Sequence, residues 1–328
     1  MSCVTGLDRL PEVSHAHIWA DWAELLCLTS ADSSLARGEL DDRMQEREEI
    51  EGEIDADTWR GAREDEPDLP PVTLGDRHRR YVTDIFAQLQ YRHQIFGGDY
   101  PFEFSDTRAT LSLRRLTNRR MLYLFLLLSA SQRYIALGRR RSLTDAFERT
   151  AADAIRSLLP DSAEMHLFGT SAPPGSRYRG LLHRKIERLA GDLGDRPLVS
   201  ADDFATNDRG DGGLDIVGWV PVGDRLGARL ILFGQATCTL QWRLKQSEAG
   251  FDRWRRRIDF AAQPRSVMCI PFSYRTSSGA WHRRLEIEDV VFLDRERMMW
   301  LLPGDRRRQS VPYDLVEEAS QQAIPAFS

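Results

Sequence analysis

The chain has 328 residues, of which 41% are hydrophobic and 29% are charged, a length and balance typical of about two globular domains with buried cores. No apolar run reaches the roughly 20 residues that cross a bilayer, and the N-terminus lacks the basic-then-apolar order of a signal peptide. The four cysteines show no paired spacing, which argues against a disulfide framework and a zinc site. We therefore expect a soluble, cytoplasmic protein that does not bind a membrane.

The net charge of −5 is unevenly distributed along the chain. Residues 39–68 hold fourteen acidic residues and four arginines, a local net charge of −10, so the remainder carries +5. A basic body is compatible with nucleic-acid binding. The acidic insert, taken as 39–71 with the prolines that end it, is compatible with a solvated helix, a flexible insert or a partner-binding segment.

Apolar spacing predicts mainly helices in the first part of the chain and a mixture of strands and helices in the second. The predicted helices span residues 15–29, 77–96, 118–137, 145–159 and 179–193, with a basic turn at 138–141. The predicted strands are short segments near 102–104 and 111–113, then 165–168, 214–222, 229–238, 267–272 and 290–293. This order indicates a mainly helical N-terminal domain, residues 1–145, and an α/β or α+β domain, residues 146–328.

Arginine dominates the basic residues, since only Lys185 and Lys245 of the 45 are lysine. The lysine ammonium is a compact point charge, whereas the guanidinium is a broad planar fork. A site that needs a small charge beside a phosphate or a water would retain lysine, and chance is the alternative explanation for both positions.

The strongest local signal is the pair of segments GDGGLDIVGW, residues 210–219, and LILFGQAT, residues 230–237. A glycine-rich turn leads into one strand, and a short turn connects it to the next, which predicts a β-hairpin. Asp215 and Gln235 would then lie side by side on one face. Asp211, four residues before Asp215, would point the same way in an extended segment. Such a group of oxygen atoms suits a hard cation such as Mg²⁺.

These residues resemble the Mrr-like branch of the PD-(D/E)XK, or restriction-endonuclease-like, nucleases. The resemblance covers roughly residues 145–245. It implies an α/β domain with a central mixed sheet, in which a helix bears an acidic residue, a strand bears a metal-binding Asp, and the adjacent strand bears Glu or Gln, one spacer and Lys. It also implies Mg²⁺ or Mn²⁺ as cofactor.

Carried onto this sequence, the resemblance assigns the metal-binding aspartate to Asp215 and the Glu-or-Gln position to Gln235. The lysine of the family falls at position 237, where this chain has Thr237. A threonine does not supply a cation, so the chain departs from the family at this point. Lys245, further along the same segment, is the candidate replacement, and an ordinary surface lysine beside a silent site is the alternative.

Two residues are candidates for the helix acid, of which Glu187 is preferred, and a solvated helix carboxylate is the alternative for either. Glu187 has a helix-loop-strand spacing before Asp211 that resembles the family, and Glu148 follows Phe147 as in the pair that often opens that helix. The predicted metal ligands are Asp215, Gln235, Asp211 and Glu187. The predicted catalytic residues are Asp215, Gln235, Lys245, Glu187 and Glu148.

Runs of arginine are candidates for contacts with the phosphate backbone of DNA. The most promising run is Arg253, Arg255 and Arg256, with Trp242 nearby as a residue that would stack on bases. Further runs lie at 114–120, 139–141 and 306–308. A solvated face paired with nearby acids is the alternative for each run.

The function expected from these features is a Mg²⁺-dependent DNA endonuclease, with restriction or antiphage defence as the setting that the resemblance implies. A partner ATPase or sensor protein would dock on the N-terminal domain, since no motor motif is present, and a homo-oligomer is a further expectation. One alternative is a catalytically silent nuclease fold that serves as a DNA-binding or assembly subunit of a multiprotein defence complex. Another is a protein-binding module whose acidic insert recruits a basic partner.

Overall fold

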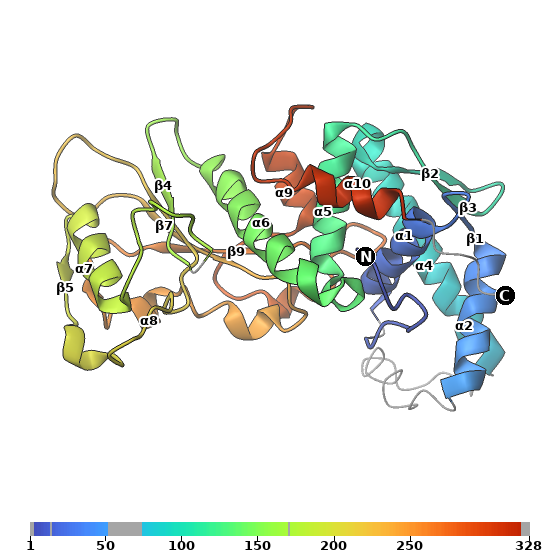
Figure 1. The fold of residues 1–328 in the computed structure, drawn as a ribbon, viewed down its shortest axis with the longest axis horizontal. Coiled ribbons are helices and arrows are strands. Elements are labelled where there is room, and N and C mark those ends of the chain that lie inside the picture. Colours follow the sequence, from blue (N-terminus) through green and yellow to red (C-terminus); the bar gives the residue numbers. More distant parts are fainter. Residues whose placement is uncertain (1–2, 14, 52–73, 170, 323–328) are drawn as a thin grey trace.

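The computed structural model describes residues 3–13, 15–51, 74–169 and 171–322, and these form a mixed α/β fold (Figure 1). Helices of the N-terminal part gather at one end of the molecule, and the last helices of the chain pack beside them. The N-terminal helices are α1 (Ala16–Thr29), α2 (Arg37–Glu51), α4 (Leu74–Phe96) and α5 (Asn118–Ala130). The acidic insert begins within α2, and most of it lies outside the described residues.

Three short strands form a small antiparallel sheet on this helical part. They are β1 (Ser34–Ala36), β2 (Phe102–Ser105) and β3 (Thr110–Leu113), in the order β1-β3-β2. The β2–β3 hairpin matches the short strands expected there, whereas β1 has no clear signal in the sequence because only three residues pair.

The single helix predicted at 118–137 is wrong, because the chain breaks after α5. Thr117 caps the start of α5 by accepting a hydrogen bond of 3.3 Å from the backbone of Arg120. A short 3-10 turn, Gln132–Tyr134, follows, and α6 (Leu137–Arg156) then begins. The basic turn expected at 138–141 is the first turn of α6, since arginine is a good helix former. The expected domain boundary at 145/146 falls inside this helix.

A five-stranded mixed sheet forms the centre of the second part, in the order β10-β9-β7-β6-β4. The strands are β4 (Glu164–Leu167), β6 (Ile216–Trp219), β7 (Ile231–Ala236), β9 (Arg265–Cys269) and β10 (Val291–Leu293). β4, β6 and β7 are antiparallel neighbours, whereas β7, β9 and β10 run parallel. The expected α/β class with a mixed sheet is confirmed at this level.

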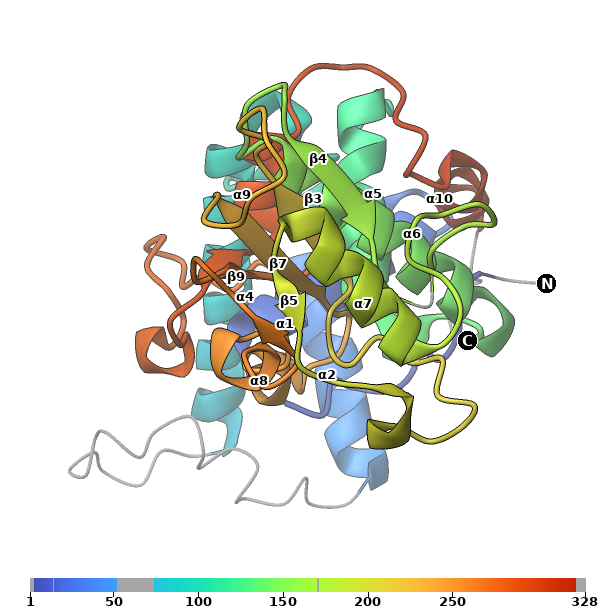
Figure 2. The ribbon, with the colours of Figure 1, turned by 90° about the vertical axis from the view of Figure 1, so that its left-hand side faces the viewer.

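The remaining elements cover the sheet, form a separate two-stranded pair or, in the case of the last helix, pack against α1 and α5. They are α7 (Leu182–Leu193), β5 (Arg196–Pro197), α8 (Phe251–Trp254), β8 (Ile258–Asp259), α9 (Arg295–Leu301) and α10 (Tyr313–Ser320). Figure 2 shows α7 and α6 on different sides of the strands. Ile216 shares a core with α6 and the N-terminal helices, whereas the next residue, Val217, shares one with α7. This alternation follows from the two-residue period of a strand.

A fully buried ionic network joins the N-terminal helices to the end of the sheet. Arg92 of α4 lies 2.7 Å from Asp21 and 2.8 Å from Glu24, both on α1. Arg295, at the start of α9, lies 2.9 Å from Asp21. Because these charges are removed from water, each needs an opposite charge beside it to offset the cost of burial. Within the described part of the chain, every helix is too short or too polar to pass through a bilayer.

Candidate functional site

The strand pairing brings Asp215 and Gln235 together, as the hairpin prediction expected. Ile216 of β6 pairs with Gly234 of β7, so Asp215, one residue earlier, lies opposite Gln235. The backbone N–H of Ala236 donates a hydrogen bond of 2.8 Å to Oδ2 of Asp215. Both side chains are buried. The Asp215 carboxylate is therefore held against the neighbouring strand, and its other oxygen remains available.

The third member of the site is Glu148, on the middle of α6. A Cβ built on Gly169, just after β4, would lie 3.2 Å from Oδ1 of Asp215 and 3.3 Å from Oε2 of Glu148. The two carboxylates therefore face one small space that Gly169 leaves open. Ser171 donates a hydrogen bond to Oε2 of Glu148, which orients that carboxylate.

The electrostatics of these two acids differ from those of surface carboxylates. Burial raises the pKa of Glu148 to about 7, and the charge of Asp211 adds to the rise. Burial also raises the pKa of Asp215 well above its ordinary value, and the charge of Glu148 raises it further. Two buried acids that repel each other favour the approach of a cation.

Gln235 provides an unexplained buried polar atom at the same end of the sheet. Its Oε1 is buried and accepts no hydrogen bond from any described residue. A buried acceptor without a donor is costly unless a ligand, an ion or a water satisfies it. No group of three or more His, Cys, Asp or Glu side chains among the described residues is arranged to hold a metal ion. Two carboxylates and one amide oxygen nevertheless match the all-oxygen ligands of Mg²⁺.

Asp211 and Lys185 lie next to this group. Oδ1 of Asp211 accepts a hydrogen bond of 2.8 Å from the backbone of Gly213, so this side chain fixes the glycine-rich turn. Its charge acts on Asp215, on Glu148 and on Lys185. The Lys185 ammonium is buried and donates to the carbonyl of Phe168 at 3.1 Å. The sequence motifs did not assign Lys185 to the site. The one sequence feature that pointed to it is that it is one of only two lysines in the chain.

Lys245 lies in the 3-10 turn Trp242–Lys245, beyond the end of β7. Its positive charge lowers the pKa of Asp215, opposing the effect of burial. Thr237, at the position of the family's lysine, is buried and follows β7 directly. The structure therefore places a lysine charge near Asp215 from position 245 rather than from 237.

Glu187 lies apart from the carboxylate pair. It is half-buried on α7 and forms an ion pair of 2.9 Å with Arg184 of the same helix. Lys185, two positions earlier, is on the buried face of this helix, and two residues along a helix correspond to a rotation of about 200°. The helix acid that the structure brings to Asp215 is Glu148.

The predicted base-stacking role of Trp242 is wrong. Its ring is buried, with its centre 5.0 Å from that of Tyr274 and 4.9 Å from that of Phe292. Such an aromatic cluster belongs to a core, and sequence alone does not separate it from an exposed stacking residue.

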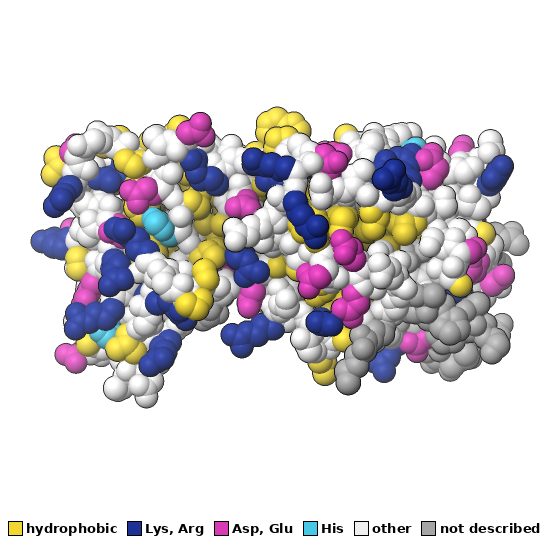
Figure 3. Space-filling model, turned by 45° about the horizontal axis from the view of Figure 1, so that its top comes forward, with side chains coloured by type: hydrophobic (Ala, Val, Ile, Leu, Met, Phe, Trp, Pro, Cys, Tyr) yellow, Lys and Arg dark blue, Asp and Glu magenta, His cyan; other side chains and the backbone are white. Residues whose placement is uncertain are grey.

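The arginines predicted to bind DNA are exposed. They are Arg253, Arg255 and Arg256, and Arg255 forms an ion pair of 3.2 Å with Asp252. Figure 3 shows Lys and Arg side chains spread among Asp and Glu over one face of the molecule, rather than in one stripe. Exposure permits contact with phosphate but does not select this run over the others.

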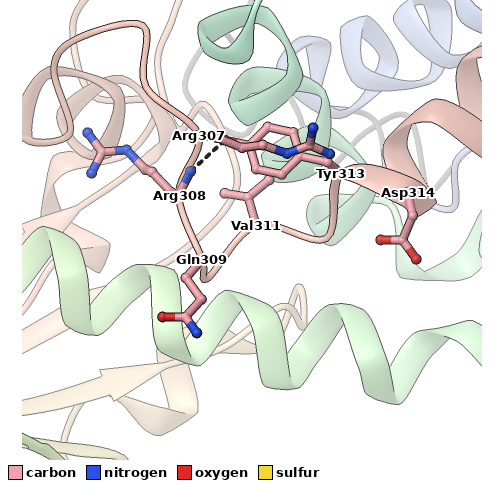
Figure 4. Close-up of a pocket in the computed structure, with 6 residues that line it drawn as sticks. All are labelled: Arg307, Arg308, Gln309, Val311, Tyr313 and Asp314. Carbon is pink, nitrogen blue, oxygen red and sulfur yellow. Dashed lines mark hydrogen bonds between the residues drawn. The ribbon is translucent and has the colours of Figure 1, made fainter.

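Two residues of the run 306–308, Arg307 and Arg308, line a shallow pocket of about 450 Å³ at the start of α10 (Figure 4). The guanidinium of Arg307 lies 4.4 Å from the centre of the Tyr313 ring and 3.9 Å from Glu317. Arg308 donates a hydrogen bond of 2.8 Å to the carbonyl of Pro303. Arg307 is therefore paired with an acid, whereas Arg308 is held by a backbone carbonyl and keeps its positive charge.

No protein-family model matches this chain, and neither a curated protein nor a solved structure shows a match to it. A function is therefore inferred from the site itself. Its features are the two carboxylates beside Gly169, the unbonded oxygen of Gln235 and the nearby lysines.

Proposed function

We propose that this chain is a divalent-metal-dependent nuclease that hydrolyses phosphodiester bonds in DNA. The proposal depends on one observation, the two buried carboxylates of Glu148 and Asp215 that face the same open space above Gly169. Asp215, Glu148 and the amide oxygen of Gln235 would hold Mg²⁺ or Mn²⁺. Restriction or antiphage defence is the proposed setting.

The order of the elements supports this proposal. A helix bears Glu148, Asp215 directly precedes the second strand of an antiparallel β4-β6-β7 meander, and Gln235 lies on the third strand. β9 then adds in parallel to β7. The arrangement agrees with the helix acid, strand Asp and adjacent Gln that the resemblance implies.

The chain's own residues would each have a defined task in hydrolysis. Ala236 holds Asp215 in one orientation through its backbone N–H, and Ser171 holds Glu148. A divalent cation held by these residues would supply the charge that polarises the phosphate and lowers the pKa of a water. Lys245 would offset negative charge on the phosphate as the bond to the leaving oxygen breaks.

The test is cleavage of plasmid DNA with Mg²⁺ or Mn²⁺ by the full chain and by Asp215→Asn and Glu148→Gln. We expect both variants to lose cleavage by at least about a hundredfold, a size typical of lost charge stabilisation, while their circular dichroism stays that of the wild type. Glu187→Gln is the matched control and should keep full activity. Cleavage by Asp215→Asn at the wild-type rate would refute the proposal.

A catalytically silent DNA-binding or assembly subunit is the second candidate, and Thr237 is the observation that favours it. The residue is only 4% exposed, so the usual lysine position is filled by a buried hydroxyl. Lys245→Met should abolish cleavage if Lys245 supplies the missing charge, and Thr237→Lys in that background should restore part of it. If the wild-type protein does not cleave DNA and Thr237→Lys does, the natural chain is the catalytically silent subunit.

A further inference from the structure

A cleft of about 800 Å³ lies between the N-terminal segment, the start of α6 and the loop after β7. Residues from the two sequence halves line it together, among them Arg9, Arg140, Thr144, Thr237 and Lys245. It is larger than the pocket beside Arg307, and of its lining only Thr237 and Lys245 belong to the site described above.

The charge of this cleft is positive once its ion pairs are taken into account. Of its acids, Glu12 pairs with Arg133 at 2.8 Å, and Asp21 is neutralised by the two buried arginines of the ionic network. Three cations remain: Arg9, Arg140 and Lys245. None of the ion pairs found between described residues includes them. Arg140 donates to the carbonyls of Ile135 and Arg133, so its guanidinium is held in place.

The carboxylate pair is not part of the cleft lining, but three lining residues are close to it along the chain or act on it. Thr144 lies one helical turn before Glu148 on α6, and residues four apart share a face of a helix. Thr237 follows Ala236, whose N–H holds Asp215. Lys245 lines the cleft, and its charge acts on Asp215. A strand in the cleft would therefore lie beside the elements that carry the proposed metal ligands, α6 and the end of β7.

The size of the cleft limits what enters it. A volume of about 800 Å³ is in the range that holds one small ligand, roughly 300–1,000 Å³. The major groove of duplex DNA alone is about 12 Å wide, so a whole duplex is too large. A short segment of one strand fits, and its phosphates match the three cations that form no ion pair with a described residue.

We infer that this cleft binds a single-stranded segment of nucleic acid, with its phosphates on Arg9, Arg140 and Lys245. The inference deepens the proposed nuclease function and depends on it only for the statement that the bound strand is cut. The preferred substrate would then be a single strand, an overhang or a locally opened duplex, rather than intact duplex DNA.

The test is fluorescence anisotropy of a labelled strand of about 12 nucleotides, a length within known site sizes, against the matching blunt duplex. The full chain is used with EDTA, so that no cleavage occurs, over a series of salt concentrations. We expect the single strand to bind at least about tenfold more tightly than the duplex. The slope of the logarithm of the binding constant against the logarithm of the salt concentration should become less steep by about 0.7 for each phosphate contact removed.

Arg140→Gln and Arg9→Gln should each weaken single-strand binding severalfold. Arg141→Gln is the matched control, since it removes the same charge from the same helix, where its side chain is 87% exposed. Thermal unfolding shows whether Arg140→Gln still folds. If it does not, Arg9→Gln still tests the inference, because Arg9 is exposed and its replacement should leave the fold intact. Duplex binding as tight as strand binding, preference for a free mononucleotide, or equal losses in Arg9→Gln and Arg141→Gln would overturn the inference. Those outcomes leave the metal-dependent cleavage assay unaffected, and failure of cleavage leaves the binding result unaffected.

Discussion

Nζ of Lys185 donates a hydrogen bond of 3.1 Å to the carbonyl oxygen of Phe168, the residue immediately before Gly169. The same ammonium lies 4.8 Å from the centre of the Phe168 ring. Helix α7 thereby fixes the backbone that passes between Glu148 and Asp215. The space between the two carboxylates is thus set by the absence of a side chain at 169 and by a lysine that holds the adjacent peptide.

Gly169→Ala should reduce metal-dependent cleavage while changing the free energy of unfolding little. Its Cβ would lie 3.2 to 3.3 Å from the two carboxylates, so they would have to separate or the cation would lose its place. We expect a loss of metal-dependent cleavage of at least about tenfold, since small displacements at a reacting centre have effects of this order. Gly191→Ala on α7 is the control, because nothing lies within 4 Å of its Cβ position. Equal activity of both variants would contradict the assignment.

Glu148→Gln should stabilise the metal-free protein at high pH only. The pKa of Glu148 in the folded state is raised to about 7, above its ordinary value. Folding therefore opposes ionisation, and stability falls as the pH rises from the ordinary pKa to about 7. Melting temperatures in EDTA should be equal for wild type and variant near the acid end of this range, and higher for the variant at pH values above it. A difference that stays constant with pH would refute the buried-carboxylate description.

Divalent cations should raise the melting temperature of the wild type, more above neutral pH than below it. The two carboxylates must lose their protons to bind the metal, and their raised pKa values oppose this in acid. Saturation at about 100 times the Kd stabilises by about 2.7 kcal/mol. Asp215→Asn should lose the shift and Glu187→Gln should keep it, with NaCl of equal ionic strength as reference. An equal shift in Asp215→Asn would place the bound cation elsewhere.

Arg92→Met should be among the most destabilising single changes outside the site. It would leave Asp21 and Glu24 of α1 buried with a reduced number of cationic partners. Breaking one side of a buried pair typically costs about 3–5 kcal/mol. Arg196→Met, whose partner Asp259 is exposed, should cost less than about 1 kcal/mol. Urea unfolding measures both, and similar losses would show that the network contributes little.

The sequence predicted those parts of the fold that local patterns determine. The helix at 77–96 corresponds to α4, Leu74–Phe96, and the β6–β7 hairpin has the expected antiparallel pairing. Because register follows from the hairpin, the neighbouring positions of Asp215 and Gln235 were predictable as well. The starts of helices were less predictable. Residues 138–141, which were expected to form a basic turn between helices, belong to the start of α6.

Long-range packing could not be predicted from the same patterns. The spacing before Asp211 favoured Glu187 as the helix acid, but the packing of α6 against the sheet brings Glu148 to Asp215 instead. The burial of Trp242 depends on Tyr274 and Phe292, which are distant along the chain. The cleft is lined by residues near position 10 and near position 240, so no local sequence motif predicts it.

Helix α6 extends across the boundary that a sequence-based division at 145/146 would cut. A recombinant fragment starting at residue 146 would begin two residues before Glu148, and the first backbone N–H groups of a helix have no internal partners. Newly made helix ends fray, so Glu148 would lose its fixed position. The fragment would also lack Leu143 and the N-terminal helices that cover the inner face of α6. Trimmed versions of this protein intended for crystallisation or activity assays should therefore retain all of α6.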